Sequence, residues 1–194
     1  MTSPYERALD LTGLHPRLQA YFSEIPAGSV GHGVGVFEVV GTPKRWLWPV
    51  LWILGMQGVV FPAWARDVPF TISNQPLGQA LRGTRTFHFV RGDRSMVDLI
   101  SAPAGLIDEL GTRGQYRASL VGSVVEGALH MHSTGMRTQW GLPLPGRVDL
   151  VERWDDSSGS QHVSVVISAP IIGRVYEYSG YFNYELRAEH VPAP

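Results

Sequence analysis

The stretch 174-RVYEYSGYFNYEL-186 sets the fold class of this chain. In an extended strand, successive side chains point to opposite faces of the sheet. One face of this stretch is then apolar and aromatic, and the other face mixes polar and apolar residues. Such a division is typical of a strand in an antiparallel sheet with one side buried. The apolar face consists of Tyr176, Tyr178, Phe182, Tyr184 and Leu186.

The same period of two extends upstream through most of residues 67–187, in short runs separated by Gly, Pro, Asn or Asp. The turns include 126-EG-127 and 156-DSSG-159. About nine or ten strands with two or three short helices predict an α+β fold with a large, curved, mostly antiparallel sheet. A twisted sheet of this size tends to curl. We therefore expect a half-barrel with the helices on its concave face, which leaves a cup.

The 194 residues suit a single domain that buries roughly 70% of its unfolded surface. Helices are predicted at the N-terminus because Ser3, Pro4 and Glu6 form a capping box with proline at the first helical position. A second helix begins near Pro16 and ends before Pro26. The predicted layout is one domain over 1–194, with N-terminal helices in 1–26, a first strand in 27–41, a tryptophan-rich helix and linker in 43–65, and antiparallel strands in 67–187.

The first predicted strand, 29-SVGHGVGVFEVVG-41, carries three glycines on one face, at positions 31, 33 and 35. A dinucleotide-binding fingerprint needs the spacing G-x-G-x-x-G followed by a helix. Here the third spacing differs and the continuation is strand-like. The pattern instead predicts a strand with a bare face, over which another element passes closely.

The segment 44-KRWLWPVLWILGMQGVVFPAWARD-67 has no charge from Trp46 to Trp64, over nineteen residues. Its length and basic flanks are those of a membrane span. Pro49, Gly55 and Pro62 interrupt it, so we expect a short helix followed by an apolar linker. A short helix that is apolar nearly all round must be covered on more than one side. It would lie across the mouth of the cup, as a lid or as a membrane contact.

Composition excludes several functions. Sixteen basic and seventeen acidic residues, without long runs of like charge, argue against a general nucleic-acid binder. With no cysteine, the chain has no disulfide, thiolate metal site or cysteine nucleophile. The start MTSPYERALD contains early acids and no apolar run, so we expect no secretory signal and a cytoplasmic protein. The oligomeric state is not encoded in any pattern we recognise.

Several pieces of the chain resemble a bacterial family, the domain of unknown function 4166. They are SPYERAL, LHPRL, the glycine-spaced strand, DELG, GLPLP and, as the most specific piece, 169-APIIGRVYEYSGYF-182. Some members are fused to saccharopine-dehydrogenase-like or short-chain-dehydrogenase-like domains, which implies an association with small apolar metabolites or lipids. Family members often have a polar or basic helix where this chain has its tryptophan-rich segment.

Two sets of polar residues are candidates for chemistry. His130 and His132 share one strand face, a spacing that can chelate a metal, but no third ligand lies nearby in sequence. Asp108 and Glu109 alternate, so one carboxylate should point toward the core, where an arginine from another strand (Arg85, Arg117 or Arg137) would pair with it. His88, between two phenylalanines, faces either the cup or solvent. No catalytic motif, metal site or cofactor motif is present.

These observations favour a binding module over an enzyme. The first hypothesis is a soluble domain that binds an apolar or amphipathic, lipid-like small molecule in the cup. The alternatives are a small enzyme or dehydrogenase accessory that uses the Glu109 carboxylate, and a peripheral membrane protein that docks through Trp46, Trp48 and Trp52. The residues predicted to bind the ligand are Trp48, Trp52, His88, Glu109, His130, His132, Arg137 and Tyr178.

Overall fold

The computed structural model describes residues 2–189. Met1 and residues 190–194, which the predicted single domain includes, lie outside the described residues. The elements in chain order are α1 (Pro4–Ala8), α2 (Pro16–Phe22), β1 (Ser29–Gly41), the 3-10 helix η1 (Arg45–Leu47), α3 (Trp48–Met56), β2 (Trp64–Ala65), β3 (Val68–Leu77), β4 (Ala80–Phe87), β5 (Arg94–Ser101), β6 (Leu106–Leu110), β7 (Tyr116–Val125), β8 (Ala128–Thr138), β9 (Pro143–Leu144), β10 (Arg147–Asp155), β11 (Ser160–Ala169) and β12 (Gly173–Ala188).

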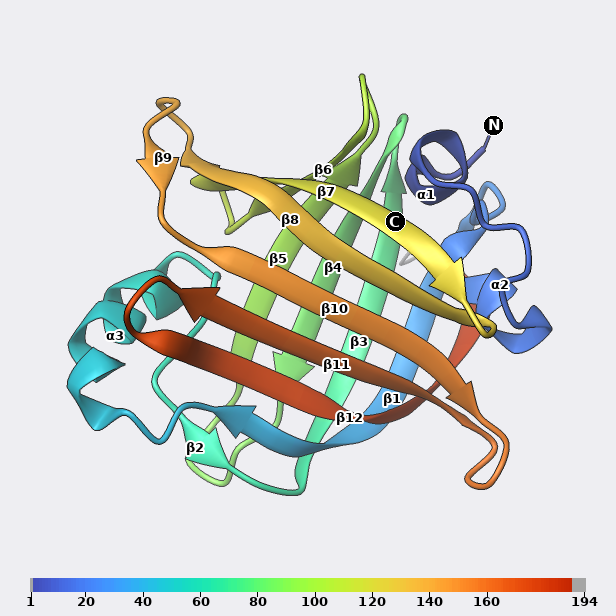
Figure 1. Ribbon diagram of the computed structural model, residues 1–194. Coiled ribbons are helices and arrows are strands. Elements are labelled where there is room, and N and C mark those ends of the chain that lie inside the picture. The colour runs from blue at the N-terminus through green and yellow to red at the C-terminus, as the bar shows by residue number, and fades with distance from the viewer. Residues whose placement is uncertain (1, 190–194) are drawn as a thin grey trace, which may run out of the picture.

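Ten of the strands form a closed antiparallel barrel (Figure 1). Each barrel strand pairs with the next one along the chain, and β12 pairs with β1 to join the two ends of the sequence. The two-residue strands β2 and β9 pair with β1 and β8 outside this ring. The prediction of a mostly antiparallel β structure with few short helices is confirmed.

The half-barrel prediction is wrong, because the sheet closes on itself. Closure depends on β8, which pairs with β10 over only four residue pairs, from Leu129↔Glu152 to His132↔Asp149. Closing the sheet removes its two unpaired edges and turns the expected concave face into a barrel interior. The helices accordingly lie at the two ends of the barrel, with α1 and α2 at one end and α3 at the other (Figure 1).

The bare face predicted for β1 is confirmed, and aromatic side chains of β12 occupy it. Gly33 pairs with Tyr184 and Gly35 pairs with Phe182. A Cβ added at Gly33 would lie 3.2 Å from side-chain carbons of Phe182 and Ile72. At Gly31 it would collide with the Tyr184 ring. The glycines therefore make room for large rings on the neighbouring strand, on the inner face of the barrel.

One end of the barrel is closed by the two N-terminal helices. The predicted capping box of α1 is present, since the Ser3 side chain accepts from the Glu6 amide and the Glu6 side chain accepts from the Ser3 amide. Helix α2 buries Leu18, Tyr21 and Phe22 against the barrel. The Tyr21 ring meets Phe182 and Tyr184 edge-on, at centroid distances of 5.7 and 4.8 Å. This end of the barrel is filled by aromatic side chains.

The other end is covered by η1, α3 and the linker to β3. The prediction of a short tryptophan-rich helix is confirmed, and the helix ends at Met56. Leu51 is its one buried residue, whereas Phe61 of the linker is buried against Phe87 and Tyr176, at 5.0 and 6.2 Å. Within residues 2–189, none of the helices combines the length and the apolar character that a bilayer span requires.

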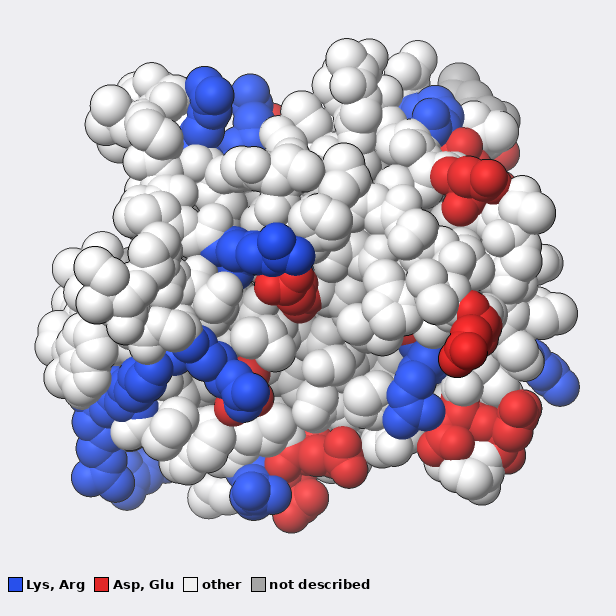
Figure 2. Space-filling model, viewed as in Figure 1, with Lys and Arg blue, Asp and Glu red and all other residues white. Residues whose placement is uncertain are grey.

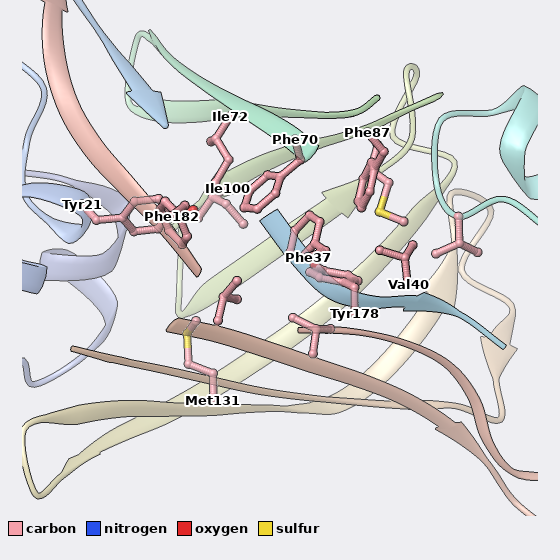
Figure 3. Close-up of a cluster of buried hydrophobic side chains, with 14 of the residues drawn as sticks. Tyr21, Phe37, Val40, Phe70, Ile72, Phe87, Ile100, Met131, Tyr178 and Phe182 are labelled. Carbon is pink, nitrogen blue, oxygen red and sulfur yellow. The ribbon is translucent and has the colours of Figure 1, made fainter. Parts of the chain in front are cut away.

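The core fills the barrel between these two covers (Figure 3). Phe37, Phe70 and Phe87 stack in a row across β1, β3 and β4, with centroid distances of 3.6 and 5.0 Å from Phe37. Tyr178 approaches Phe37 edge-on at 5.2 Å. As the apolar face of 174–186 predicts, Tyr176, Tyr178 and Phe182 are buried. The interior on the opposite wall is less tightly filled and contains a cavity.

Candidate functional site

The cavity lies in the barrel interior behind the linker residues Val59 and Val60, at the α3 end. Its volume is about 80 Å³, enough for several water molecules or a small organic group. Twelve of its sixteen lining residues are apolar, and they come from the linker and from β5, β6, β7, β8, β10 and β11. The four polar lining residues are Arg85, Asp98, Asp108 and Tyr178.

Arg85 and Asp98 form an ion pair inside the barrel. They point inward from β4 and β5, and Arg85 Nη1 lies 2.5 Å from Asp98 Oδ1. The pair fits because Gly83, opposite Asp98 in the sheet, has no side chain. A Cβ at Gly83 would lie 2.8 Å from the Asp98 carboxylate. Buried charges are retained only when they are paired, and this pair meets that condition.

Asp108 adds a second carboxyl group to the cavity wall, without a second cation. It points inward from β6, and its Oδ1 is buried without a hydrogen-bond partner among the described residues. Burial, and then the negative charge of Asp98, raise the pKa of Asp108 well above its usual value, although Arg85 acts in the opposite direction. This shift favours the neutral acid, which can donate a hydrogen bond into the cavity.

Tyr178 supplies the fourth polar group of the cavity. Burial raises its pKa to about 12, although the charge of Arg85 lowers it, so the hydroxyl keeps its proton at neutral pH. Among the residues predicted from sequence to bind a ligand, Tyr178 is the one that lines this cavity. A guanidinium, a carboxyl group whose pKa is raised and a phenol thus share one small apolar cavity.

A separate polar cluster lies toward the α2 end and does not line the cavity. The Gln161 side-chain amide donates to Glu152 Oε2, and Asn74 Nδ2 donates to the Tyr184 hydroxyl at 3.3 Å. Burial raises the pKa of Glu152 to about 7, against the lowering effects of Gln161 and Arg85. Glu152 and Gln161 are almost fully buried. This cluster occupies interior positions of strands that elsewhere carry apolar residues. Gln161 and Tyr184 also line an open pocket of about 560 Å³ beside α2, whereas Glu152 is not among its lining residues.

Glu109, the carboxylate predicted to serve the site, lies on the outer surface of the barrel. Its Oε1 is 2.5 Å from Arg117 Nη2 in a partly exposed ion pair. The two carboxylates of 108–109 alternate faces as predicted, and Asp108 is the one that points inward. Of the three candidate arginines, Arg85 is the interior one. Glu109 is therefore not among the residues that line the cavity, and the hypothesis of an enzyme that uses its carboxylate loses support.

His130, His132 and Arg137 lie on the outer face of β8, away from the cavity. The two histidines line a shallow groove of about 350 Å³, together with the surface ion pair of Arg147 and Asp149. Within residues 2–189, no group of three or more metal-binding side chains comes together. The structure thus separates these residues from Tyr178, with which the sequence grouped them.

The remaining predicted residues also lie outside the cavity. His88 contacts Thr71 and Asp93, at 3.3 and 3.1 Å from its two ring nitrogens, on the outside of the barrel. Trp48 is partly buried, with its indole nitrogen 3.5 Å from the Thr42 carbonyl oxygen. Trp52 is 61% exposed. The two tryptophans cover the end of the barrel but do not reach the cavity lining.

Sequence reasoning missed Asp98, named Arg85 only as one of three possible partners for a buried carboxylate, and placed Glu109 rather than Asp108 among the ligand-binding residues. A signal for Asp108 exists, because in 106-LIDEL-110 it shares its face with Leu106 and Leu110. Asp98 likewise shares a face with two apolar neighbours, Met96 and Ile100. A charged residue at an apolar position of a period-two run is therefore the pattern that identifies the interior groups.

Comparison with known proteins places the chain in a family. The family model described as "Domain of unknown function (DUF4166)" matches residues 14–182, which is most of the chain and includes the motif 169-APIIGRVYEYSGYF-182. The resemblance seen in the sequence is thereby confirmed. No curated protein and no solved structure matches the chain.

Proposed function

For this chain, which belongs to the DUF4166 family, we propose that the barrel binds a small amphipathic molecule in its interior cavity. The observation that carries the proposal is the unpaired carboxyl oxygen of Asp108 in the wall of an otherwise apolar chamber. A buried polar atom without a partner costs roughly 1–3 kcal/mol. A ligand that supplies the missing hydrogen bond recovers that free energy on binding.

The lining defines the chemistry of the ligand. Twelve apolar side chains favour an apolar body, and burying it is the main source of affinity. Arg85, Tyr178 and the neutral Asp108 all offer hydrogen-bond donors to one region of the wall. The ligand is therefore expected to carry a single oxygen-bearing group, such as a hydroxyl or a carbonyl. Ligand pockets commonly combine an apolar lining with a few convergent polar groups in this way.

The size of the cavity sets a second requirement. At about 80 Å³ it is smaller than the roughly 300–1,000 Å³ of typical ligand pockets, so a lipid-sized molecule enters only if its cover moves. That cover is the linker after α3. It is held by two backbone hydrogen bonds of 2.8 Å, from Val97 N to Gly58 O and from Thr112 N to Gln57 O. Moving the linker would open the cavity at the α3 end.

Titration with small alcohols and ketones of increasing apolar size tests the proposal, with binding followed by native mass spectrometry and by protein NMR. We expect wild type to bind members of the series. Asp108→Leu should weaken binding about tenfold, the equivalent of one lost hydrogen bond of about 1.4 kcal/mol.

Glu109→Gln is the matched control, because it alters the neighbouring residue on the opposite face of the same strand. It should bind as wild type does. A wild-type protein that stays empty across the series, or an Asp108→Leu variant that binds as tightly as wild type, would refute the proposal.

A second candidate function is acid–base catalysis on the bound molecule, which the raised pKa of Asp108 favours. In this reading the neutral Asp108 is the proton donor, and Arg85 and Tyr178 orient the substrate. Incubating each bound compound with wild type and with Asp108→Asn separates the two functions. Product formed by wild type but not by Asp108→Asn, with binding retained, identifies an enzyme, and an unchanged compound identifies a binding protein.

A further inference from the structure

The two ends of the barrel carry very different side chains. The docking face comprises the segments at the α3 end, which are residues 42–67, 88–93, 111–115, 139–146 and 170–172. The opposite face comprises residues 2–28, 78–79, 102–105, 126–127, 156–159 and 189. Each segment connects two barrel strands or precedes or follows one, so the division follows from the up-and-down order of the strands.

The docking face exposes most of the large apolar side chains of the surface. Of the sixteen large hydrophobic residues that are exposed among residues 2–189, ten lie on this face, the other six lie on barrel strands, and none lies in the segments of the opposite face. The ten project from four separate segments, and four of them are tryptophans. An apolar surface of this kind marks an interaction site. The ten residues are Trp46, Val50, Trp52, Ile53, Met56, Trp64, Val90, Trp140, Leu142 and Ile171, and Trp46, Trp52, Trp64 and Trp140 make tryptophan the commonest type among them.

The charges of the two faces are also opposite in sign. The docking face has five basic and two acidic residues, and the opposite face has two basic and six acidic residues. Arg45, Arg66, Arg91 and Arg113 form no salt bridge with another described residue. Figure 2 shows Lys and Arg side chains beside the uncharged surface of α3 at the lower left, and an acidic cluster at the lower right, where Figure 1 has the β10–β11 turn.

A groove within the docking face combines both properties. It has a volume of about 440 Å³ and lies between residues 61–65 and the β4–β5 loop. Phe61 and Phe89 contribute aromatic surface to it, and the exposed Arg91 and Arg94 contribute positive charge. A groove lined in this way can accept an anionic head group with the beginning of its apolar chain.

We propose that the docking face binds the surface of an anionic lipid bilayer, with its exposed tryptophans at the level of the head groups. Tryptophan is favoured at membrane interfaces, and each Lys or Arg near an anionic surface strengthens binding. A second copy of this chain fits the face less well. A two-fold dimer would place a positively charged face against itself, where like charges repel. Docking would hold the cover of the cavity, residues 57–61, against the lipid.

Vesicle flotation tests the proposal, with phosphatidylcholine vesicles compared with vesicles that also contain phosphatidylglycerol. Wild type should float with the anionic vesicles and much less with the neutral ones, and binding should weaken as salt is raised. Arg91→Glu/Arg113→Glu should reduce the partition coefficient at least about tenfold. Trp52→Ser/Trp140→Ser, which removes an exposed tryptophan from each of two segments, should reduce it on both kinds of vesicle.

Matched controls come from outside the docking face. Leu77→Ser and Arg82→Glu alter exposed residues of the β3–β4 hairpin at the other end of the barrel and should float as wild type does. Asp108→Leu, which weakens binding at the proposed cavity site, should also float normally, so the two proposals fail independently. Wild type that stays with the soluble fraction on anionic vesicles, controls that lose binding as strongly as the docking-face variants, or a dimer that forms through this face in solution would overturn the proposal.

Discussion

Helices α2 and α3 cover the two ends of one barrel, and they differ in what they bury. Helix α2 carries its apolar residues on one face and buries Leu18, Tyr21 and Phe22 completely or nearly so. Helix α3 is apolar on all sides and buries only Leu51, while Trp52 and Ile53 remain exposed. The difference shows that α2 packs its apolar side chains into the end of the barrel, whereas α3 leaves apolar side chains exposed to solvent.

The interior behind the two helices differs in the same way. Behind α2, aromatic rings fill the space and the one buried carboxylate, Glu152, accepts a hydrogen bond from Gln161. Behind α3 and its linker lies the cavity, where Asp108 has an oxygen without a partner. A packed end supports stability, and an end with an unfilled chamber and an unpaired polar group is where binding is expected.

Truncating one aromatic residue at each end tests this comparison directly. Phe22→Ala should lower the free energy of unfolding by about 3–5 kcal/mol, because it opens a cavity in the packed end. Trp52→Ala should change it by about 0.5 kcal/mol or less, because the side chain is 61% exposed. Urea denaturation followed by circular dichroism measures both. Similar losses for the two variants would show that α3 is as much a part of the core as α2.

Removing the interior cation should also cost about 3–5 kcal/mol. Arg85→Met leaves the Asp98 carboxylate buried without its partner and takes positive charge away from Asp108. Arg117→Met, which breaks the exterior pair with Glu109, should cost about 1 kcal/mol or less.

The double variant Arg85→Met/Asp98→Leu sharpens this test, because an apolar pair replaces the ion pair. It should be more stable than Arg85→Met alone. A double variant that is less stable than the single one would mean that Asp98 is held by groups other than Arg85.

The Glu152 carboxyl group predicts a pH dependence of stability with a definite sign. Its pKa is raised from 4.5 to about 7 in the folded protein, so between these values the unfolded chain loses this proton first. The free energy of unfolding therefore falls as pH rises from about 4.5 to about 7, by on the order of 3 kcal/mol, and levels off above that. Below about pH 4.5 the carboxyl group is protonated in both states and costs nothing.

Glu152→Gln should remove this part of the pH dependence, which urea denaturation at several pH values measures. Asp108 contributes in the same direction because its pKa is also raised, so a weaker slope should remain. An unchanged slope in Glu152→Gln would show that Glu152 titrates normally in the folded protein.

Much of the fold follows from local sequence. Period-two alternation identified the strands, and the turn at Glu126-Gly127 forms where expected, with both residues at positive φ. Closure of the barrel did not follow, because alternation says which face of a strand is buried but not which strand pairs with it. The contact of β8 with β10 over four residue pairs makes the difference between a half-barrel and a barrel.

The candidate site was less predictable than the fold. The sequence grouped His130, His132 and Glu109 with Tyr178, and closure of the barrel places these three on the outside. Alternation required one of Asp108 and Glu109 to point inward, and the prediction chose Glu109 although Asp108 shares its face with Leu106 and Leu110. Nothing in the local pattern showed that Arg85 and Asp98, on strands β4 and β5, would meet Asp108 at one cavity.

By itself, the sequence determined the β-rich fold, the N-terminal helices, the bare face of β1 and the break of the tryptophan-rich segment into a short helix. Each of these features follows from a few neighbouring residues. Pro and Gly begin or end the elements, and the alternation of apolar and polar side chains identifies the strands. Only the tertiary structure decided that the sheet closes, that Arg85, Asp98, Asp108 and Tyr178 share a chamber, and that one end of the barrel is apolar and basic. These features depend on contacts between residues far apart in the chain, and such contacts leave no periodic signal in the sequence.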